Sequence, residues 1–277
     1  FPIKEVSDIG RKYNIPLIMD NTASPVICKP IEHGAAVVIH SLTKYIGGHG
    51  TAVAGSIVDS GNFDWTADPK RQPLFNEPDA SYGGAVWGNV VPELTGANVP
   101  FAVRARVCLL RDLGSALSPD NAFAIIQGLE TVALRMKQHC ENAEKVVKFL
   151  KKHNEVTKVI YSTEHDKIIS GRANKYLKGG NGPMVGIELK GGIEAGKKFI
   201  ESLKMFYHVA NIGDVRSLAI HPASTTHSQL NEKELAASGV TQSYVRLCIG
   251  IEHIDDIIED LDQALIKSSK GNLKAVS

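Results

Sequence analysis

Residues 36–50 read Ala-Val-Val-Ile-His-Ser-Leu-Thr-Lys-Tyr-Ile-Gly-Gly-His-Gly, an apolar run that is followed by polar residues and then by glycines. The apolar run covers residues 35–40, and a run this short is typical of a buried strand in a parallel sheet rather than of an amphipathic helix. It is followed by Ser41, Thr43 and Lys44. The stretch therefore predicts a buried strand whose carboxyl end presents one amine and two hydroxyl groups.

These groups are the ones that a pyridoxal phosphate site needs. A lysine directly beyond a buried strand is partly desolvated, and desolvation favours the neutral, nucleophilic amine. Such an amine can form an imine with pyridoxal, while the hydroxyl groups and the glycine backbone can bind the phosphate. The alternatives are a solvated loop lysine and an ordinary glycine turn. A Walker A loop is excluded, because Lys44 precedes the glycines and no Gly-Lys-Ser/Thr follows them.

The segments before this stretch predict a parallel α/β sheet. Apolar residues at helical spacing predict a helix over residues 3–14, and residues 17–19 predict a buried strand that ends at Asp20. Residues 27–33 predict a short helix. The order helix, strand, helix, strand is typical of a parallel sheet, in which ligands bind outside the carboxyl ends of the strands. We therefore expect Asp20 and Lys44 to lie at the ends of neighbouring strands.

Asp20 has a specific function to offer at such a site. A carboxylate that faces the pyridine nitrogen keeps this nitrogen protonated, and the protonated ring withdraws electrons from a carbanion next to the imine. The alternative is a structural aspartate that caps the turn beginning at Thr22.

The composition limits the classes to which the chain can belong. Its 277 residues allow one large or two modest domains, and its formal net charge of +1 provides no basic surface for nucleic acid or an anionic membrane. No apolar run approaches the ~20 residues of a membrane span. The cysteines show neither a Cys-x-x-Cys pair nor zinc spacing, and they are Cys28, Cys108, Cys140 and Cys248. We therefore expect a cytoplasmic protein with reduced thiols and with no metal, nucleic-acid or membrane partner.

The chain after the glycines continues as an α/β protein. The pattern predicts a strand over 52–58, a long irregular segment over 59–100 and a helix over 101–113. Ser118 as the N-cap and Pro119 at the first position predict the start of a long helix that runs to about residue 153. A helix this long typically joins two domains, so we place a boundary near residue 138, between domains 1–138 and 139–277.

The second domain is predicted to be a strand-rich α/β mixture. Strands are expected over 156–161, 184–190, 217–221 and 244–249, and helices over 193–204, 231–238 and 253–267. Arg246 lies within the last strand, where an arginine is costly unless it pairs with an anion. Either it contacts a buried carboxylate, or its planar guanidinium binds the carboxylate of a substrate. The polar turns at 211–214 and 221–227 could line the same cleft.

The polar motifs together occur in an order that resembles one known family. They are Asp20-Asn21-Thr22, Ser41-Leu42-Thr43-Lys44, Gly47-Gly48-His49-Gly50, Gly128-Leu129-Glu130-Thr131 with Arg135-Met136, His221-Pro222-Ala223-Ser224, and Arg246. This series resembles the Cys/Met-metabolism family of fold-type I pyridoxal phosphate enzymes over residues 5–267. The resemblance implies an α/β, PLP-dependent transferase-like fold of the aspartate aminotransferase type. Residues 1–138 would then be the C-terminal part of the large, mostly parallel PLP-binding domain, and residues 139–277 the small C-terminal α/β domain.

Within the family, two segments resemble the O-acetylhomoserine sulfhydrylase branch: residues 59–100, with Asn62-Phe63-Asp64-Trp65 and Glu77-Pro78-Asp79, and residues 211–214. This branch implies a γ-replacement in methionine and cysteine biosynthesis, in which O-acetyl-L-homoserine and sulfide give L-homocysteine and acetate. Cystathionine γ-synthases and methionine or cystathionine γ-lyases are the alternatives, and they have a shorter connection at residues 59–100. A non-catalytic remnant or assembly partner is an alternative of another class.

The resemblance also implies a role for each polar residue named above. Lys44 and Asp20 would be catalytic, Asp20, Thr22, Ser41, Thr43 and Lys44 would bind pyridoxal 5'-phosphate, and Arg246 and Asn211 would bind the amino-acid substrate. Lys44 would hold the cofactor as an imine, Asp20 would contact the pyridine nitrogen, Thr22 would lie near the ring, and Ser41 and Thr43 would contact the phosphate.

The beginning of the chain differs from the family pattern. Family members carry roughly 150 further residues before the position of Phe1. That portion supplies a tyrosine stacked on the cofactor and a Tyr/Arg pair that reaches a neighbouring subunit. We therefore expect the sequence to be a piece of a longer or cleaved protein, or an inactive remnant. The intact protein is expected to be a homo-oligomer, namely a homotetramer, whose active sites are shared between subunits.

Overall fold

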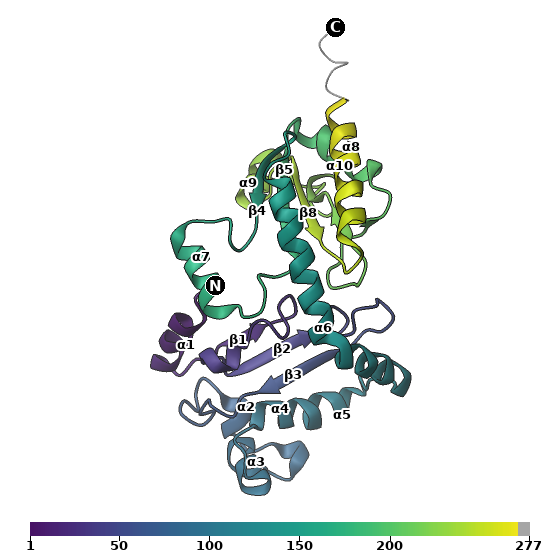
Figure 1. Cartoon of the computed structure of the whole chain (residues 1–277). Helices are drawn as coiled ribbons and strands as arrows, with labels where there is room; N and C mark the ends of the chain where they lie inside the picture. The colour runs from purple at the N-terminus through teal and green to yellow at the C-terminus, as the bar shows by residue number, and fades with distance from the viewer. Residues whose placement is uncertain (271–277) are drawn as a thin grey trace. The chain divides into compact units, whose positions relative to one another are not determined.

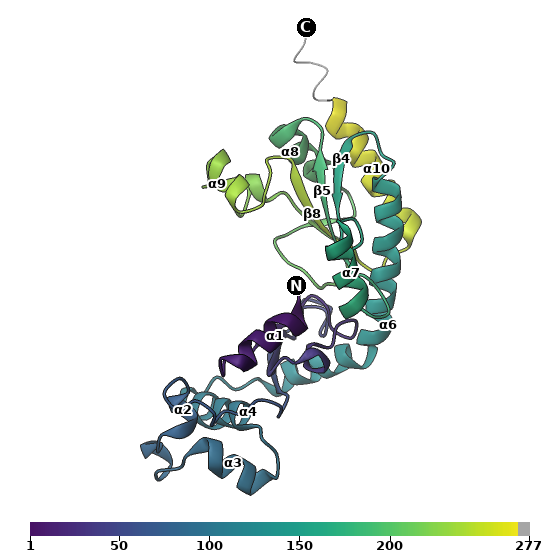
Figure 2. The same ribbon diagram turned by 90° about the vertical axis from the view of Figure 1, so that its left-hand side faces the viewer.

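A computed structural model describes residues 1–270 of the chain, which form two compact units (Figures 1 and 2). The first unit comprises residues 1–43 and 51–126, and the second comprises residues 44–50 together with residues 127–270. A three-stranded sheet lies in the first unit, and a five-stranded sheet lies in the second.

The sheet of the first unit has the order β1–β2–β3. β1 (Ile18–Asp20) is parallel to β2 (Val37–Ser41), whereas β3 (Gly55–Asp59) is antiparallel to β2. The chain between β1 and β2 contains the 3-10 helix η1 (Pro30–His33) and is long enough to return to the same end of the sheet. β3 follows β2 through a turn-rich connection without a helix, so that it runs in the opposite direction and makes the sheet mixed.

The elements predicted around this sheet are confirmed, although one of them is shorter than expected. Helix α1 (Ile3–Lys12) and the three strands lie where the hydrophobic pattern predicts them. The helix expected over residues 27–33 is limited to η1. It begins at Pro30, whose fixed φ suits the first position of a helix, and it ends at Gly34, which has a left-handed φ of 101°.

Residues 59–100 contain a buried aromatic cluster and three short helices, which are α2 (Pro73–Asn76), η2 (Ala80–Tyr82) and α3 (Trp87–Thr95). The ring of Trp65 lies 4.7 Å from that of Phe75 and 5.1 Å from that of Phe101, measured between ring centroids. The prediction of an irregular segment is therefore wrong for these helices. Packing of the aromatic side chains stabilises them although their own propensity is weak, as Pro92 inside α3 shows.

The predicted helix over residues 101–113 is confirmed as a continuous helical segment. It consists of α4 (Pro100–Arg104), the π-helix η3 (Ala105–Leu110) and α5 (Arg111–Leu113). Its end is set by Gly114, which adopts the left-handed conformation with a φ of 71°.

The long helix α6 (Pro119–Leu150) is also confirmed. Ser118 caps its start, because the Ser118 hydroxyl accepts a hydrogen bond from the Asn121 backbone N–H at 3.2 Å. The two compact units divide within this helix, between Ile126 and Gln127. The domain boundary expected near residue 138 lies within the same helix and stays a prediction.

The sheet of the second unit has the order β4–β5–β8–β7–β6. Its strands are β4 (Val156–Ile160), β5 (Met184–Leu189), β6 (Tyr207–His208), β7 (Leu218–Ile220) and β8 (Tyr244–Cys248). All neighbouring strands are antiparallel except β6 and β7, which are parallel. Four of the five strands were predicted, and β6 was not, since two residues are too few to show an alternating pattern.

Helices α8 (Gly192–Ser202) and α10 (Ile254–Lys270) pack against each other and, with the C-terminal half of α6, against one face of this sheet (Figure 2). Val185, Ile187 and Leu189 alternate along β5 and are all buried in this core. The predicted helices are confirmed, including α9 (Glu232–Ala237). Helix α7 (Lys167–Tyr176) was missed, although Asp166 caps two backbone N–H groups at its start, because its apolar spacing is weak.

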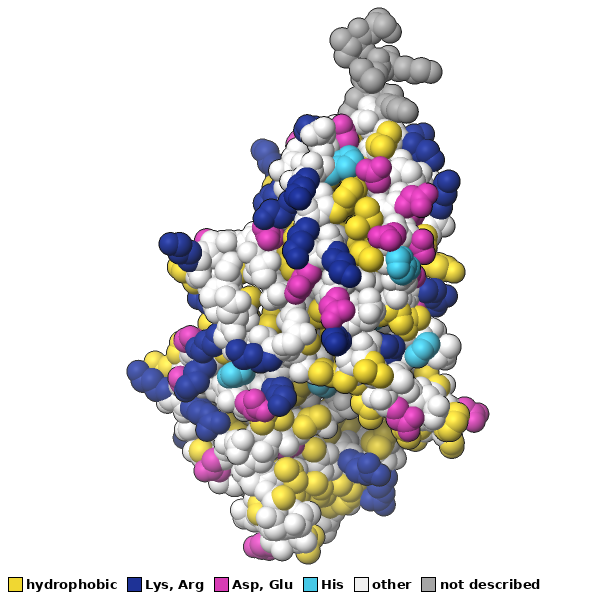
Figure 3. Space-filling model, in the orientation of Figure 1, with side chains coloured by type: hydrophobic (Ala, Val, Ile, Leu, Met, Phe, Trp, Pro, Cys, Tyr) yellow, Lys and Arg dark blue, Asp and Glu magenta, His cyan; other side chains and the backbone are white. Residues whose placement is uncertain are grey.

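Charged side chains of both signs are interspersed on the visible surface, and hydrophobic side chains lie exposed among them (Figure 3). This distribution agrees with the small formal net charge of +1. In the described residues 1–270, no helix has the length and apolar character that crossing a membrane requires.

Candidate active site

The turn that bears Lys44 follows β2 directly and belongs to the second unit. Within the turn, the Gly48 backbone N–H donates a hydrogen bond to the Lys44 carbonyl at 2.7 Å. The ammonium of Lys44 donates a hydrogen bond to Asn211 Oδ1. The structure therefore brings together a lysine and an asparagine that the sequence assigns to the same site.

Arg246 is the third polar residue of this group. Val245 and Leu247 point into the helix-packed core, and because side chains alternate along a strand, Arg246 lies on the opposite face of the sheet. Its Nη2 donates a hydrogen bond to the backbone carbonyl of Asn211 at 3.2 Å. Asn211 therefore contacts Lys44 through its side chain and Arg246 through its backbone.

The guanidinium of Arg246 is half-buried, and within residues 1–270 no carboxylate lies at ion-pairing distance from it. Pairing with a buried carboxylate of the protein is one of the two roles that the sequence allows for Arg246. Because such a partner is absent from the described residues, donors of the guanidinium are free for an anion.

In the first unit, Asp20 and Ser41 terminate the parallel strands β1 and β2. The Asp20 carboxylate is exposed and accepts a hydrogen bond from the Thr22 backbone N–H at 2.9 Å. Hydrogen bonds from the side chain and the backbone of Thr22 lower the pKa of Asp20, and the nearby His40 lowers it further. Asp20 is therefore ionised at neutral pH and is exposed enough to contact a cationic group.

The hydroxyl residues of the first unit lie close to Asp20 or just beyond it. The Ser41 backbone N–H donates to Thr22 Oγ1 at 2.8 Å, which joins the ends of β1 and β2. Thr43 Oγ1 accepts a hydrogen bond from the Ala54 backbone N–H at 3.0 Å and donates one to the Ala54 carbonyl at 3.3 Å. Thr22 and Ser41 thus form one local group with Asp20, whereas the hydroxyl of Thr43 is bonded to the connection that leads to β3.

Two buried residues near the Lys44 turn, Tyr45 and His139, were not assigned by the sequence. The hydroxyl of Tyr45 lies 2.9 Å from Cys248 Sγ, and the ring of Tyr45 packs edge-on against His139 at 5.4 Å. His139 Nδ1 lies 2.7 Å from the Ile249 carbonyl, and burial lowers the pKa of His139 to about 4. The only signal in the sequence is that Tyr45 follows Lys44 directly.

The residues present in each unit fit the groups of pyridoxal phosphate. The first unit offers an exposed, ionised carboxylate at Asp20 and hydroxyl groups at Thr22 and Ser41. The second unit offers the amine of Lys44 and the half-buried guanidinium of Arg246, which no acid neutralises within residues 1–270. A carboxylate suits a pyridinium nitrogen, an amine suits an aldehyde, and a guanidinium suits an acid group.

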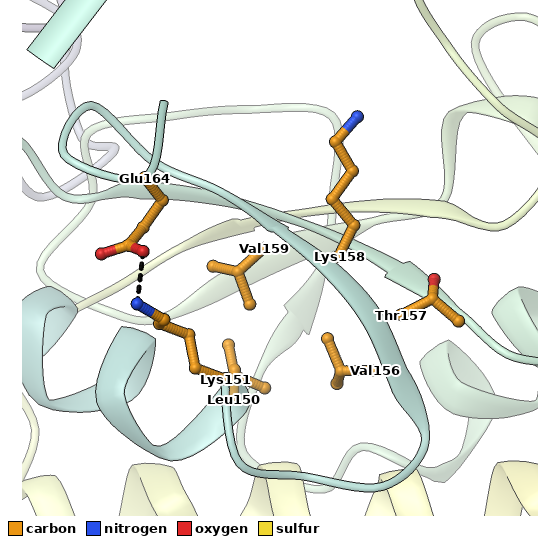
Figure 4. A pocket seen from close by; sticks show the side chains of 7 residues that line it. All are labelled: Leu150, Lys151, Val156, Thr157, Lys158, Val159 and Glu164. Atoms are coloured by element: carbon orange, nitrogen blue, oxygen red, sulfur yellow. Dashed lines mark hydrogen bonds and ion pairs between the residues drawn. The ribbon is translucent and has the colours of Figure 1, made fainter. Parts of the chain in front are cut away.

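A surface pocket of the second unit contains none of these residues. It lies between the end of α6 and β4, with Leu150, Val156 and Val159 on its apolar side (Figure 4). The Lys151 ammonium and the Glu164 carboxylate form an ion pair of 2.5 Å across it. The pocket is therefore separate from the residues that the sequence assigns to the candidate site.

Comparisons with known proteins give a consistent result. A family model described as Cys/Met metabolism PLP-dependent enzyme matches residues 1–266. The chain is 48% identical over 269 residues to an O-acetyl-L-homoserine sulfhydrylase of Leptospira meyeri, with 95% of the chain and 60% of the relative covered. It is 44% identical over 264 residues to an O-acetyl-L-homoserine sulfhydrylase of Corynebacterium glutamicum, with 94% and 59% covered.

Two solved structures are also similar to the chain. One is described as an O-acetylhomoserine (thiol)-lyase from Campylobacter jejuni with an N'-pyridoxyl-lysine-5'-monophosphate group, and it matches with a TM-score of 0.85 and 38% identity over 95% of this chain and 62% of that chain. The other is a cystathionine gamma synthase from Xanthomonas oryzae pv. oryzae in complex with aminoacrylate and cysteine, with a TM-score of 0.75 and 30% identity over 97% and 60% of the two chains. The chain thus spans about 60% of the length of the curated relatives named above.

Proposed function

Because this chain belongs to the family of Cys/Met metabolism PLP-dependent enzymes, we propose that it takes part in the conversion of O-acetyl-L-homoserine and sulfide to L-homocysteine and acetate. The names of the relatives at 48% and 44% identity support this reaction. Membership of the family confirms the predicted fold class, an α/β fold of the PLP-dependent transferase type, and pyridoxal 5'-phosphate as the cofactor. The reaction is proposed for the intact protein, since the chain covers 60% of the Leptospira relative.

The contact of Asn211 with both Lys44 and Arg246 is the observation that carries the proposal. An amino-acid substrate has an amino group and a carboxylate on the same carbon. A guanidinium can bind the carboxylate, and an amine beside it can act on the proton of that carbon. Asn211 contacts both residues, although Lys44 is 167 positions from it in the chain and Arg246 is 35 positions from it.

Each site residue then has a defined role. When bound, pyridoxal phosphate supplies the electron-withdrawing ring that stabilises negative charge next to the substrate nitrogen. Lys44 would bind the cofactor covalently and, once displaced, would remove the proton from the substrate α-carbon. Arg246 and the amide of Asn211 would hold and orient the substrate.

The residues of the first unit would bind the cofactor itself. Asp20 would keep the pyridine nitrogen protonated, as its lowered pKa allows. Thr22 would lie near the ring, and Ser41 and Thr43 would contact the phosphate. To donate to the phosphate, the hydroxyl of Thr43 would exchange its hydrogen bond with the Ala54 carbonyl for one with a phosphate oxygen. That Asp20 and Lys44 act on one and the same ring is part of this proposal.

Substitution of Arg246 tests the proposal in the intact protein. Arg246→Lys should lower kcat/KM for homocysteine formation by about 10- to 100-fold, because hydrogen bonds to charged groups contribute about 1.5–3 kcal/mol. The exposed Arg106→Lys is the matched control and should leave the rate unchanged. Lys44→Ala should abolish the reaction. Homocysteine formation near the wild-type rate in Lys44→Ala would contradict the proposal.

A cystathionine γ-synthase or a γ-lyase is the second candidate, and the similarity to the Xanthomonas cystathionine gamma synthase is the observation in its favour. Its 30% identity is lower than the 48% identity to the Leptospira sulfhydrylase. Supplying sulfide, cysteine or no acceptor to the intact protein separates the three reactions. A colourless preparation that binds no pyridoxal phosphate would instead indicate a non-catalytic assembly partner.

We further propose that the intact protein is a cytoplasmic homotetramer whose active sites are shared between subunits. Several large apolar side chains are exposed, among them Leu113, Phe123 and Leu134. Contacts with neighbouring subunits would bury these side chains. Light scattering of the intact protein tests the assembly, and a monomer that is fully active would contradict it.

A further inference from the structure

Arg135 lies on α6 in the second unit and is buried, with only 6% of its surface exposed. Its Nη1 donates to the Tyr45 carbonyl at 2.7 Å, and its Nη2 donates to the carbonyls of Ile46 at 2.8 Å and Gly128 at 2.6 Å. Its Nε donates to Thr131 Oγ1 at 3.1 Å. The guanidinium therefore joins helix α6 to the two residues that follow Lys44.

All of these partners are uncharged. Within residues 1–270 no carboxylate lies at ion-pairing distance from Arg135, and burial lowers its pKa. A buried cation without an acid is costly, and an apolar side chain of similar size would avoid this cost. The presence of a buried arginine here is explained if the carbonyls of Tyr45, Ile46 and Gly128 need a common hydrogen-bond donor. A buried carbonyl without a hydrogen-bond partner is also costly.

Two glycines allow the helix and the turn to approach this closely. A Cβ on Gly128 would lie 2.3 Å from the Gly47 carbonyl oxygen and 2.6 Å from that of Ile46. A Cβ on Gly48, whose φ is +77°, would lie 2.2 Å from Arg135 Nη1. A side chain at position 128 would push α6 and the turn apart, and a side chain at position 48 would displace the guanidinium of Arg135.

The other side of the turn contacts the segment that holds Asn211. The Val215 backbone N–H donates to the Gly48 carbonyl at 2.8 Å. A Cβ on Gly213 would lie 2.7 Å from Lys44 Cβ. The turn is thus packed between α6 and residues 211–215. The position of the Lys44 amine relative to Asn211 therefore depends on how closely the turn packs against Arg135.

We propose that Arg135 is a positioning residue, whose guanidinium fixes the backbone after Lys44 so that the Lys44 amine is held at Asn211. The inference rests on the proposed role of Lys44 as the amine that binds pyridoxal phosphate. Arg135 would act without touching the cofactor or the substrate. The planar guanidinium is required because one side chain must donate hydrogen bonds to carbonyls on two separate segments. The single ammonium of a lysine is less suited to this geometry.

Local hydrogen exchange distinguishes positioning from a general contribution to stability. In the intact protein, Arg135→Lys should speed the exchange of backbone amides in residues 45–50 by about tenfold or more, because the turn opens without global unfolding. Amides of α10 should keep their wild-type rates. The exposed Lys137→Gln, on the same helix, is the control and should change neither.

A matched pair of glycine variants tests the same idea without touching the arginine. Gly128→Ala places a methyl group against the carbonyls of the turn, whereas Gly171→Ala in α7 meets no atom within 4 Å. Both add the same group to a helix, where alanine is favoured over glycine. Only Gly128→Ala should speed exchange in residues 45–50. This pair also decides the question if Arg135→Lys fails to fold.

Cofactor attachment supplies the second readout. After borohydride reduction, mass spectrometry of the peptide that contains Lys44 measures the fraction carrying the pyridoxyl group. Arg135→Lys and Gly128→Ala should each need about tenfold more pyridoxal phosphate for half-maximal labelling, whereas Gly171→Ala should match the wild type. Absence of any pyridoxyl group on wild-type Lys44 would refute the proposed function, while the exchange data would still test the role of Arg135. Wild-type exchange at residues 45–50 in both variants, or equal acceleration throughout the second unit, would overturn the inference.

Discussion

The side chain of Asn211 accepts a hydrogen bond from the ammonium of Lys44, although the two residues are 167 positions apart in the chain. The backbone carbonyl of the same asparagine accepts from Arg246 at 3.2 Å. Asn211 thus positions both the amine of Lys44 and the guanidinium of Arg246, which we propose binds the substrate carboxylate. This arrangement and the buried residues around it can be tested by substitution.

Replacing the amide of Asn211 should weaken the reaction without unfolding the protein. Asn211→Leu has a similar size and cannot accept a hydrogen bond, so we expect kcat for homocysteine formation to fall by about 10- to 100-fold, given about 1.5–3 kcal/mol for a hydrogen bond to a charged group. Asn211→Ser, which keeps an acceptor, should lose less. The exposed Asn89→Leu serves as the control. Equal rates for Asn211→Leu and the wild type would show that the contact has no role in turnover.

Loss of the Asp20 charge should slow turnover even when the cofactor remains bound. We expect Asp20→Asn to lower kcat by about 100- to 1,000-fold, in the range found when one preorganised electrostatic group is removed from an active site. The bound cofactor is quantified by its absorbance after release in alkali, so that loss of rate and loss of cofactor are separated. The exposed Asp8→Asn should retain the wild-type rate. An unchanged kcat in Asp20→Asn would contradict its role at the pyridine nitrogen.

The buried contact between Tyr45 and Cys248 should contribute to stability. Tyr45→Phe removes the hydroxyl that lies 2.9 Å from Cys248 Sγ and leaves the ring in place. We expect the free energy of unfolding to fall by about 0.5–1.5 kcal/mol, the usual net contribution of one hydrogen bond, as measured by urea titration. Tyr13→Phe, at an exposed position, should have no effect. A Tyr45→Phe variant as stable as the wild type would mean that the contact contributes nothing.

His139 should make stability depend on pH below neutrality. Burial lowers its pKa from 6.5 to about 4, so between these values the unfolded chain binds a proton that the folded protein does not. The free energy of unfolding therefore does not depend on His139 protonation above pH 6.5. It falls by about 3 kcal/mol in total as the pH drops from 6.5 to about 4.

A variant that does not titrate isolates this effect. His139→Asn can still donate to the Ile249 carbonyl, which lies 2.7 Å from His139 Nδ1. The free energy of unfolding of the wild type should therefore fall more steeply between pH 6.5 and pH 4.5 than that of His139→Asn, with about 1.4 kcal/mol for each unit of pH at most. Parallel pH curves for the two proteins would refute the assignment.

Much of the fold could be predicted because its signals are local. The apolar run of β2, the spacing of α6 and the cap at Ser118 each depend on neighbours within a few residues. The helices in residues 59–100 could not be predicted in the same way. They depend on aromatic side chains, such as Trp65 and Phe101, that meet only after the chain has folded.

The sequence by itself determined the polar residues of the candidate site, because Asp20 and the run Ser41-Leu42-Thr43-Lys44 follow apolar strands at the carboxyl ends where an α/β sheet binds its ligands. Only the tertiary structure decided what those residues touch. The second unit brings Asn211 to Lys44, and it places the guanidinium of Arg135 against the carbonyls of Tyr45 and Ile46. The physical reason is that hydrophobic periodicity depends on adjacent residues, whereas a hydrogen bond between distant residues depends on how closely two segments pack, which here requires glycine at positions 48, 128 and 213.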